Sequence, residues 1–217
     1  MSGAKPKHRA PRQWQILRGL PDVITLLRLL LAPAMVIIAY AHGNARLVLG
    51  LMAFCFCTDL IDGALARWLR STSPSSARLD SIADFTFYLC IPIAGWLVWP
   101  ATVAQQGPWF VAGVASVVLP AVVGLAKFHH ASCYHVWLAK LAAGSMAVGV
   151  VLLFGYQIAL PFHAAVIIAS IAAVEEIAIT LVLDRPRTDV RGLWQVLAER
   201  RATARPADRR APGDHAR

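Results

Sequence analysis

Four carboxylates stand close together in a part of the chain that is otherwise apolar. The first two are three residues apart and the last two are four apart, so each pair is expected to share one face of a helix. A carboxylate at membrane depth costs roughly 2.5–3.5 kcal/mol on insertion scales. Four such groups therefore indicate that something positive is bound between them. They are Asp59, Asp62, Asp80 and Asp84.

The residue types around these carboxylates indicate what is bound. A hard divalent cation takes oxygen ligands, which two facing helix ends could supply. Gly63 and Ala66 leave bare backbone beside the first pair, and Arg67 offers a fork suited to phosphate. A metal, small residues and an arginine together point to a phosphate-bearing substrate. In a plainer interpretation the acids are only salt-bridged, with Arg70 and Arg78 as further available partners.

The spacing resembles the signature of the CDP-alcohol phosphotransferase (phosphatidyltransferase) family, DGxxAR(x8)GxxxDxxxD, with a further aspartate three residues before it. Every element stands at its offset, and one differs in identity, because Ser76 replaces the second glycine. The run from Pro21 to Arg28 looks like the start of the family's first membrane helix, Pro-Asn-x-x-Thr-x-x-Arg, with Asp22 in place of the asparagine. The resemblance covers a six-helix core, roughly residues 20–183.

The resemblance implies an enzyme of phospholipid biosynthesis. Members move a phosphatidyl group from a CDP-linked lipid such as CDP-diacylglycerol to an alcohol and release CMP, with Mg²⁺ or Mn²⁺. By position, Asp59, Asp62 and Asp80 would hold the metal. Asp84 is expected as a further metal ligand and as the general base, because a carboxylate within hydrogen-bond reach can take the proton of the acceptor. The donor would be bound by the other motif residues, which are Gly63, Ala66, Arg67, Ser76, Thr25 and Arg28.

The motif does not fix the acceptor alcohol. Glycerol 3-phosphate is the first expectation, and Lys127 and Lys140 could meet its phosphate. Inositol or its phosphate, serine, choline and another phospholipid are alternatives, since relatives use all of them. The resemblance also leaves a homodimer open.

Composition indicates an integral membrane protein. Of the 217 residues, 58% are hydrophobic and only 15% are charged, against about 25% charged in soluble domains. Several apolar runs approach the roughly 20 residues that span a bilayer. The predicted fold is all-α, with six transmembrane helices and a polar cavity that faces the cytoplasm. The expected helices cover residues 22–42, 45–69, 76–99, 108–128, 134–156 and 161–183.

The basic residues predict the orientation of these helices. Nineteen of the 21 lysines and arginines fall on one side of the six-helix scheme, and only Arg46 falls on the other, with Arg28 inside the first helix. Because lysine and arginine are retained on the cytoplasmic side, both termini and the four aspartates are expected there. The expected location is the cell's inner membrane.

The two ends of the chain are expected to lie outside the catalytic domain, which covers residues 21–184. Residues 1–20 form a basic segment at the membrane interface, without a recognisable cleavable signal. Residues 185–217 form a basic, partly disordered tail. The net charge of +9 is concentrated in these ends, and anionic lipid explains it better than nucleic acid.

Several ionisable residues are left open by the sequence. Glu175 and Glu176 lie inside the last helix, where an acid is a functional candidate by default, or they only pair with Arg28 or a lysine. The histidines between the fourth and fifth helices are expected to be ordinary interfacial residues. They are His129, His130 and His135.

Two other classes of function compete with the enzyme. An ion-coupled transporter would also use intramembrane acids, but these acids cluster at one membrane end and no inverted repeat is visible. A catalytically inactive membrane scaffold is the other alternative, because Ser76 and Asp22 depart from the family pattern. Substrate-dependent release of CMP separates the enzyme from both.

Overall fold

The computed structural model describes residues 12–69, 74–128, 137–183, 192 and 194–195. These residues form seven helices and no strand, which confirms the all-α prediction. In chain order the helices are α1 (Arg12–His42), α2 (Ala45–Leu69), α3 (Pro74–Val98), α4 (Pro100–Gln105), α5 (Gly107–Phe128), α6 (Trp137–Tyr156) and α7 (Leu160–Val182).

The six long helices correspond to the six predicted ones, with two differences. α1 starts at Arg12 rather than at residue 22, so part of the expected interfacial segment continues into the first membrane helix. Residues 100–105, expected as a connection, form the short helix α4. Pro100 stands at its first position, where the fixed φ of proline suits a helix and its missing N–H is not needed.

Five helices are long and apolar enough to cross a membrane, so the protein is an integral membrane protein. α2 is as long as α3 but is not among the five, and it carries Arg46, Asp59 and Asp62. The five candidate spans are Gly19–His42, Arg78–Val98, Gly107–Phe128, Leu138–Tyr156 and Leu160–Val182. Length and composition therefore support five of the six predicted spans, and a crossing of the membrane by α2 stays a prediction.

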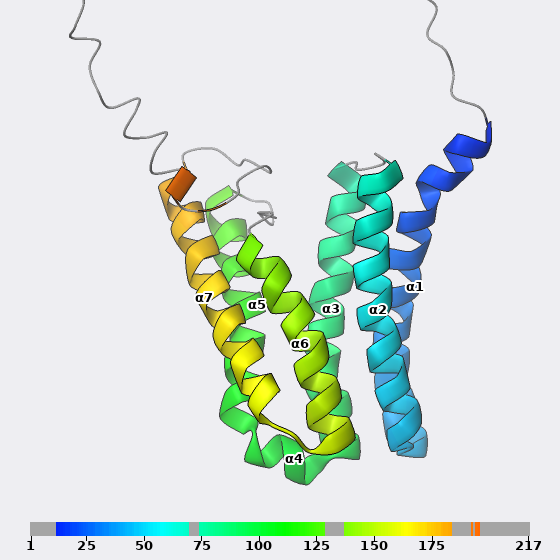
Figure 1. Ribbon diagram of the computed structural model, residues 1–217, viewed down its shortest axis with the longest axis vertical. Helices are drawn as coiled ribbons and strands as arrows, with labels where there is room; N and C mark the ends of the chain where they lie inside the picture. The colour runs from blue at the N-terminus through cyan, green and yellow to red at the C-terminus, as the bar shows by residue number, and fades with distance from the viewer. Residues whose placement is uncertain (1–11, 70–73, 129–136, 184–191, 193, 196–217) are drawn as a thin grey trace, which may run out of the picture.

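The helices form two groups that stand side by side (Figure 1). α1 packs against both α2 and α3, and α7 packs against both α5 and α6. Contacts of α2 with α6 and of α3 with α5 join the groups. The short helix α4 closes the end of the bundle drawn at the bottom of Figure 1, where Thr102 donates a hydrogen bond of 2.8 Å to Gln157.

Several of the predictions fall on residues that the structure does not describe. These are most of the basic segment 1–20, the loop 70–73, the histidine-rich connection 129–136 and most of the tail 185–217. The helix ends next to these segments all lie at the end drawn at the top of Figure 1. Successive long helices therefore run in opposite directions, with these ends on one side, as the six-helix scheme from the sequence predicts.

Close backbone approach holds α6 and α7 together. A Cβ atom added at Gly149 of α6 would lie 2.8 Å from the Cα atom of Phe162 in α7. Small residues of this kind allow membrane helices to approach closely, where packing rather than water drives their association.

We expect Gly149→Ala to destabilise the protein by about 1–3 kcal/mol, because the added methyl group overpacks a contact with backbone that cannot move aside. Gly144→Ala is the matched control, since nothing lies within 4 Å of a Cβ atom there, on the same helix. Alanine should even favour the helix at that position by up to about 1 kcal/mol. Thermal unfolding in detergent measures both, and a Gly149→Ala melting temperature at or above the wild type would contradict the close packing.

Candidate active site

A single arginine on α1 lies at the centre of the four aspartates. Arg28 is fully buried, and its Nη1 atom lies 2.5 Å from Asp59 Oδ1. Its Nη2 atom lies 2.8 Å from Asp80 Oδ1 and 2.9 Å from Asp84 Oδ1, and 3.5 Å from Asp62 Oδ2. One guanidinium thus contacts carboxylates from two helices, which its planar fork of five N–H donors makes feasible.

The helix positions explain this convergence. α1 packs against both α2 and α3. The two acidic pairs belong to the C-terminal half of α2 and the N-terminal half of α3, and these two helix ends lie side by side at the top of Figure 1. Thr25, one turn before Arg28, supports the arrangement. Its hydroxyl lies 3.1 Å from Asp62 Oδ2 and 3.0 Å from the carbonyl oxygen of Pro21. We call Arg28 and the four aspartates the acidic cluster.

The carboxylates of the acidic cluster differ in exposure. The Asp62 side chain is only 4% exposed, whereas those of Asp59, Asp84 and Asp80 are 24%, 36% and 48% exposed. Asp62 therefore anchors the cluster in the protein, and the other three can be reached by a ligand.

The donor set fits a divalent metal. One oxygen from each of Asp59, Asp62 and Asp80 lies within 4.8 Å of the others. Oxygen ligands of Mg²⁺ or Ca²⁺ stand roughly 2.0–2.6 Å from the ion, so ligands of one ion lie within about 5 Å of one another. If ionised, the four carboxylates would carry more charge than the single positive charge of Arg28 offsets. The excess negative charge favours a further cation at this place.

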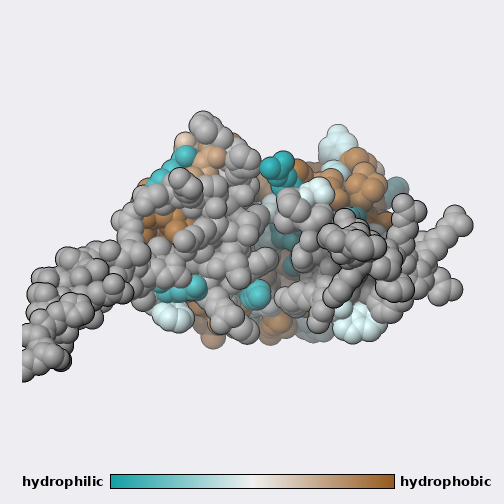
Figure 2. All heavy atoms as spheres, turned by 90° about the horizontal axis from the view of Figure 1, so that it is seen from above, coloured by the Kyte–Doolittle hydropathy of each residue, from teal (hydrophilic) through white to brown (hydrophobic). Residues whose placement is uncertain are grey.

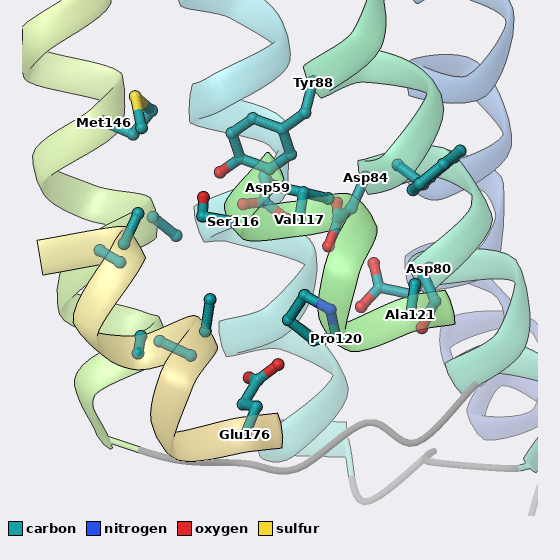
Figure 3. A pocket seen from close by; sticks show the side chains of 18 residues that line it. Asp59, Asp80, Asp84, Tyr88, Ser116, Val117, Pro120, Ala121, Met146 and Glu176 are labelled. Atoms are coloured by element: carbon teal, nitrogen blue, oxygen red, sulfur yellow. The ribbon is translucent and has the colours of Figure 1, made fainter. Parts of the chain in front are cut away.

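A cavity of about 340 Å³ lies beside the acidic cluster, between the two helix groups (Figure 3). Asp59, Asp80 and Asp84 line it from one side. The facing walls come from α5, α6 and α7 and are mostly small and apolar. Among them are Ser116, Pro120, Ala121, Ala142, Met146 and Ala172. Seen from the end with the acidic cluster, hydrophilic side chains lie between two apolar parts of the molecule (Figure 2).

Four polar residues that line the cavity were not among the predicted site residues, and they are Ser81, Tyr88, Ser116 and Glu176. Tyr88 lines it one turn after Asp84, and its ring packs against Phe56 and Phe87 with centroids 6.3 Å and 5.9 Å away. Glu176 faces the same space from α7 (Figure 3). The four-residue spacing from Asp80 through Asp84 to Tyr88 is the signal that could have identified the tyrosine.

The remaining predicted residues are placed only in part. Gly63, Ala66 and Arg67 belong to α2, but their side chains lie outside the described part of the structure. Ser76 is half-buried in the first turn of α3 and does not line the cavity. Arg78 is exposed, and Arg28 takes the pairing role that the plainer interpretation gave to other arginines.

The apolar helices and the carboxylate cluster beside a cavity define a helical membrane protein with a charged site between its helices. Residues 18–182 match the family model of the CDP-alcohol phosphatidyltransferases, and the chain belongs to this family.

Two curated relatives share the name CDP-diacylglycerol–glycerol-3-phosphate 3-phosphatidyltransferase. The protein of Pseudomonas fluorescens is 32% identical over 125 residues, which are 57% of this chain and 57% of the relative. The protein of Cereibacter sphaeroides is 33% identical over 126 residues, or 51% of this chain and 57% of the relative. The similarity thus spans little more than half of each relative. No solved structure matches the chain at a significant level.

Thr25→Val tests how the acidic cluster is supported, because valine removes the hydroxyl near Asp62 and keeps the shape. We expect it to cost about 1.5–3 kcal/mol of unfolding free energy, the usual value for a hydrogen bond to a charged group. Thr58→Val is the matched control, since its buried hydroxyl donates only to the Cys55 carbonyl oxygen of its own helix among the described residues. Equal melting temperatures for the two variants would show that Thr25 does not support Asp62.

Proposed function

We propose that the protein transfers a phosphatidyl group from a CDP-linked lipid, such as CDP-diacylglycerol, to the hydroxyl of an alcohol and releases CMP. One observation carries the proposal. The four aspartates of the family motif converge on Arg28 and three of them open into one cavity. Membership of the family favours this transferase over an ion-coupled transporter.

Asp59, Asp62 and Asp80 are the residues that would hold Mg²⁺ or Mn²⁺. A divalent ion bound there supplies positive charge that neutralises a pyrophosphate and makes CMP a better leaving group. Arg28 holds the three carboxylates together before any substrate arrives, so little reorganisation is needed at binding.

Asp84 is the residue that we propose as the general base. It lies on the cavity wall, one helical turn beyond Asp80, and its contact of 2.9 Å with Arg28 fixes its orientation. The acceptor hydroxyl gives its proton to Asp84, and its oxygen forms a bond to the phosphorus attached to the lipid. The bond from this phosphorus to the oxygen of CMP breaks, and CMP leaves with that electron pair.

The remaining motif residues are proposed to bind the CDP-linked lipid donor. Gly63, Ala66 and Ser76 stand where members of the family have small residues at the nucleotide, and Arg67 stands where its fork can meet phosphate. Thr25 acts on the site through Asp62.

For the membrane we propose six spans, with α2 as the sixth, and both termini and the cavity on the cytoplasmic side of the inner membrane. The alternation of the helix ends and the 25-residue length of α2 support this. Glycerol 3-phosphate is the acceptor that we propose first, because both curated relatives are named for it. Inositol or its phosphate is the second candidate, and a homodimer stays compatible with the proposal.

The test is release of CMP from CDP-diacylglycerol by purified protein with a panel of alcohols, with the lipid product identified by mass spectrometry. We expect release to require an acceptor and Mg²⁺ or Mn²⁺ and to stop with a chelator. Full activity of protein shown to be metal-free would exclude the metal, and no release with any acceptor would exclude the transferase and favour an inactive scaffold.

Two isosteric variants separate the proposed roles inside the acidic cluster. Asp84→Asn cannot take a proton, so we expect turnover to fall by roughly 10²–10⁴, the usual contribution of general base catalysis, with metal and donor affinity kept. Asp80→Asn should lose metal affinity instead. Calorimetry beside the CMP assay measures both quantities. An equal loss of metal affinity in both variants would mean that the four carboxylates act as one metal site without a separate base.

A further inference from the structure

The cavity has a carboxylate on the wall opposite the acidic cluster. Glu176 of α7 is half-buried and lines the cavity that Asp80 and Asp84 line from α3 (Figure 3). The backbone carbonyl oxygen of Glu176 accepts a hydrogen bond of 2.8 Å from Thr180, so the backbone there is satisfied. Its side-chain carboxylate has no hydrogen-bond or ion-pair partner among the described residues.

Two cations that could form an ion pair with Glu176, Arg28 and Lys127, make other contacts. Arg28 is engaged by the four aspartates. Lys127, at the end of α5, is exposed and donates a hydrogen bond of 2.8 Å to the carbonyl oxygen of Leu181. Neither arrangement includes Glu176, so the simple ion pair that the sequence left open is not formed with these two residues.

The described residues of α6 and α7 that line the cavity beside Glu176 offer no hydrogen-bond donor. The cavity-lining residues of α6 and α7 beside it are alanines, which have no donor group. They are Ala139, Ala142, Ala143, Ala169, Ala172 and Ala173. A carboxylate within a membrane helix is costly unless it meets a partner or water. With no side-chain partner among the described residues, Glu176 is open to hydrogen bonds from a molecule in the cavity.

The position of Glu176 suits contact with the acceptor alcohol rather than with the CDP-linked donor. The motif residues proposed for the nucleotide belong to α2 and to the start of α3. Glu176 reaches the cavity from the other helix group, so that a small molecule in the cavity lies between it and Asp84. A volume of about 340 Å³ is at the lower end of the range for small-molecule sites, roughly 300–1,000 Å³.

We propose that Glu176 determines acceptor specificity by accepting a hydrogen bond from a second donor group of the acceptor, a hydroxyl or an ammonium, while the reacting hydroxyl faces Asp84. This inference rests on the proposed function. An acceptor phosphate would have to point away from Glu176, since like charges repel strongly in a site of low dielectric. Glycerol 3-phosphate satisfies this if its middle hydroxyl, and not its phosphate, meets the carboxylate.

The test compares the wild type with Glu176→Ala, Glu176→Gln and the neighbour variant Glu175→Gln in the CMP assay. The acceptors are glycerol 3-phosphate, 3-hydroxypropyl phosphate (which lacks the middle hydroxyl), inositol, serine and ethanolamine. We expect Glu176→Ala to raise the KM of the best acceptor at least tenfold and to leave the KM of CDP-diacylglycerol within twofold. Glu175 does not line the cavity, so its variant should match the wild type.

The Glu176→Gln variant distinguishes an acceptor that donates its hydrogen bond from a hydroxyl from one that donates it from an ammonium group. An uncharged amide still accepts a hydrogen bond, so a hydroxyl acceptor should keep its KM within about threefold in Glu176→Gln, whereas an ammonium acceptor should lose at least tenfold. The wild type should also prefer glycerol 3-phosphate to 3-hydroxypropyl phosphate, because a site built to bind a hydroxyl rejects the analogue without it.

The outcomes distinguish this inference from the proposed function. An active wild type with unchanged acceptor KM in Glu176→Ala would overturn the role of Glu176 and leave the transferase intact, whereas a wild type that releases no CMP with any acceptor would overturn both. If Glu176→Ala does not fold, the binding of acceptor to Glu176→Gln and to the wild type is measured by calorimetry without donor. Parallel losses in donor KM, acceptor KM and melting temperature would show a structural role and contradict the proposal.

Discussion

The contact of Arg28 with four carboxylates is the interaction on which the rest of this structure depends. A buried guanidinium without partners would be far too costly in an apolar helix, and four aspartates without a cation would repel one another. Together they tie α1 to both α2 and α3 at one end of the bundle. The position of the first three helices is therefore set by charge at this end, and by packing of apolar side chains such as Met35 and Met52 toward the other.

This constraint also gives the site its function. Because Arg28 engages the carboxylates from the side of α1, their exposed surface turns toward α5, α6 and α7. The cavity there has a strongly acidic wall made by Asp59, Asp80 and Asp84 and a wall of small apolar residues interrupted by Glu176. In the proposed transfer, the acidic wall would meet the metal and the diphosphate, and the opposite wall would meet a small alcohol.

Much of this arrangement can be predicted from the sequence, because it rests on short spacings. The pairs Asp59–Asp62 and Asp80–Asp84 share helix faces as their offsets require, and the six long helices follow the apolar runs. The sequence could not show that Arg28 is the common partner, since it stands 31 and 52 residues from two of its contacts and other arginines are nearer. Tyr88 could have been found from its spacing of four residues after Asp84, whereas α4 depends on how residues 100–105 pack at the end of the bundle.

The most direct measurement is a double-mutant cycle between Arg28 and Asp59 in metal-free protein. The unfolding free energies of Arg28→Met, Asp59→Asn and the double variant are compared with that of the wild type. Residues that share an ionic network couple by about 0.5–3 kcal/mol, so the double variant should be less destabilised than the sum of the single ones by that amount. Additive effects, within about 0.5 kcal/mol, would contradict the view that one arginine holds the carboxylates together.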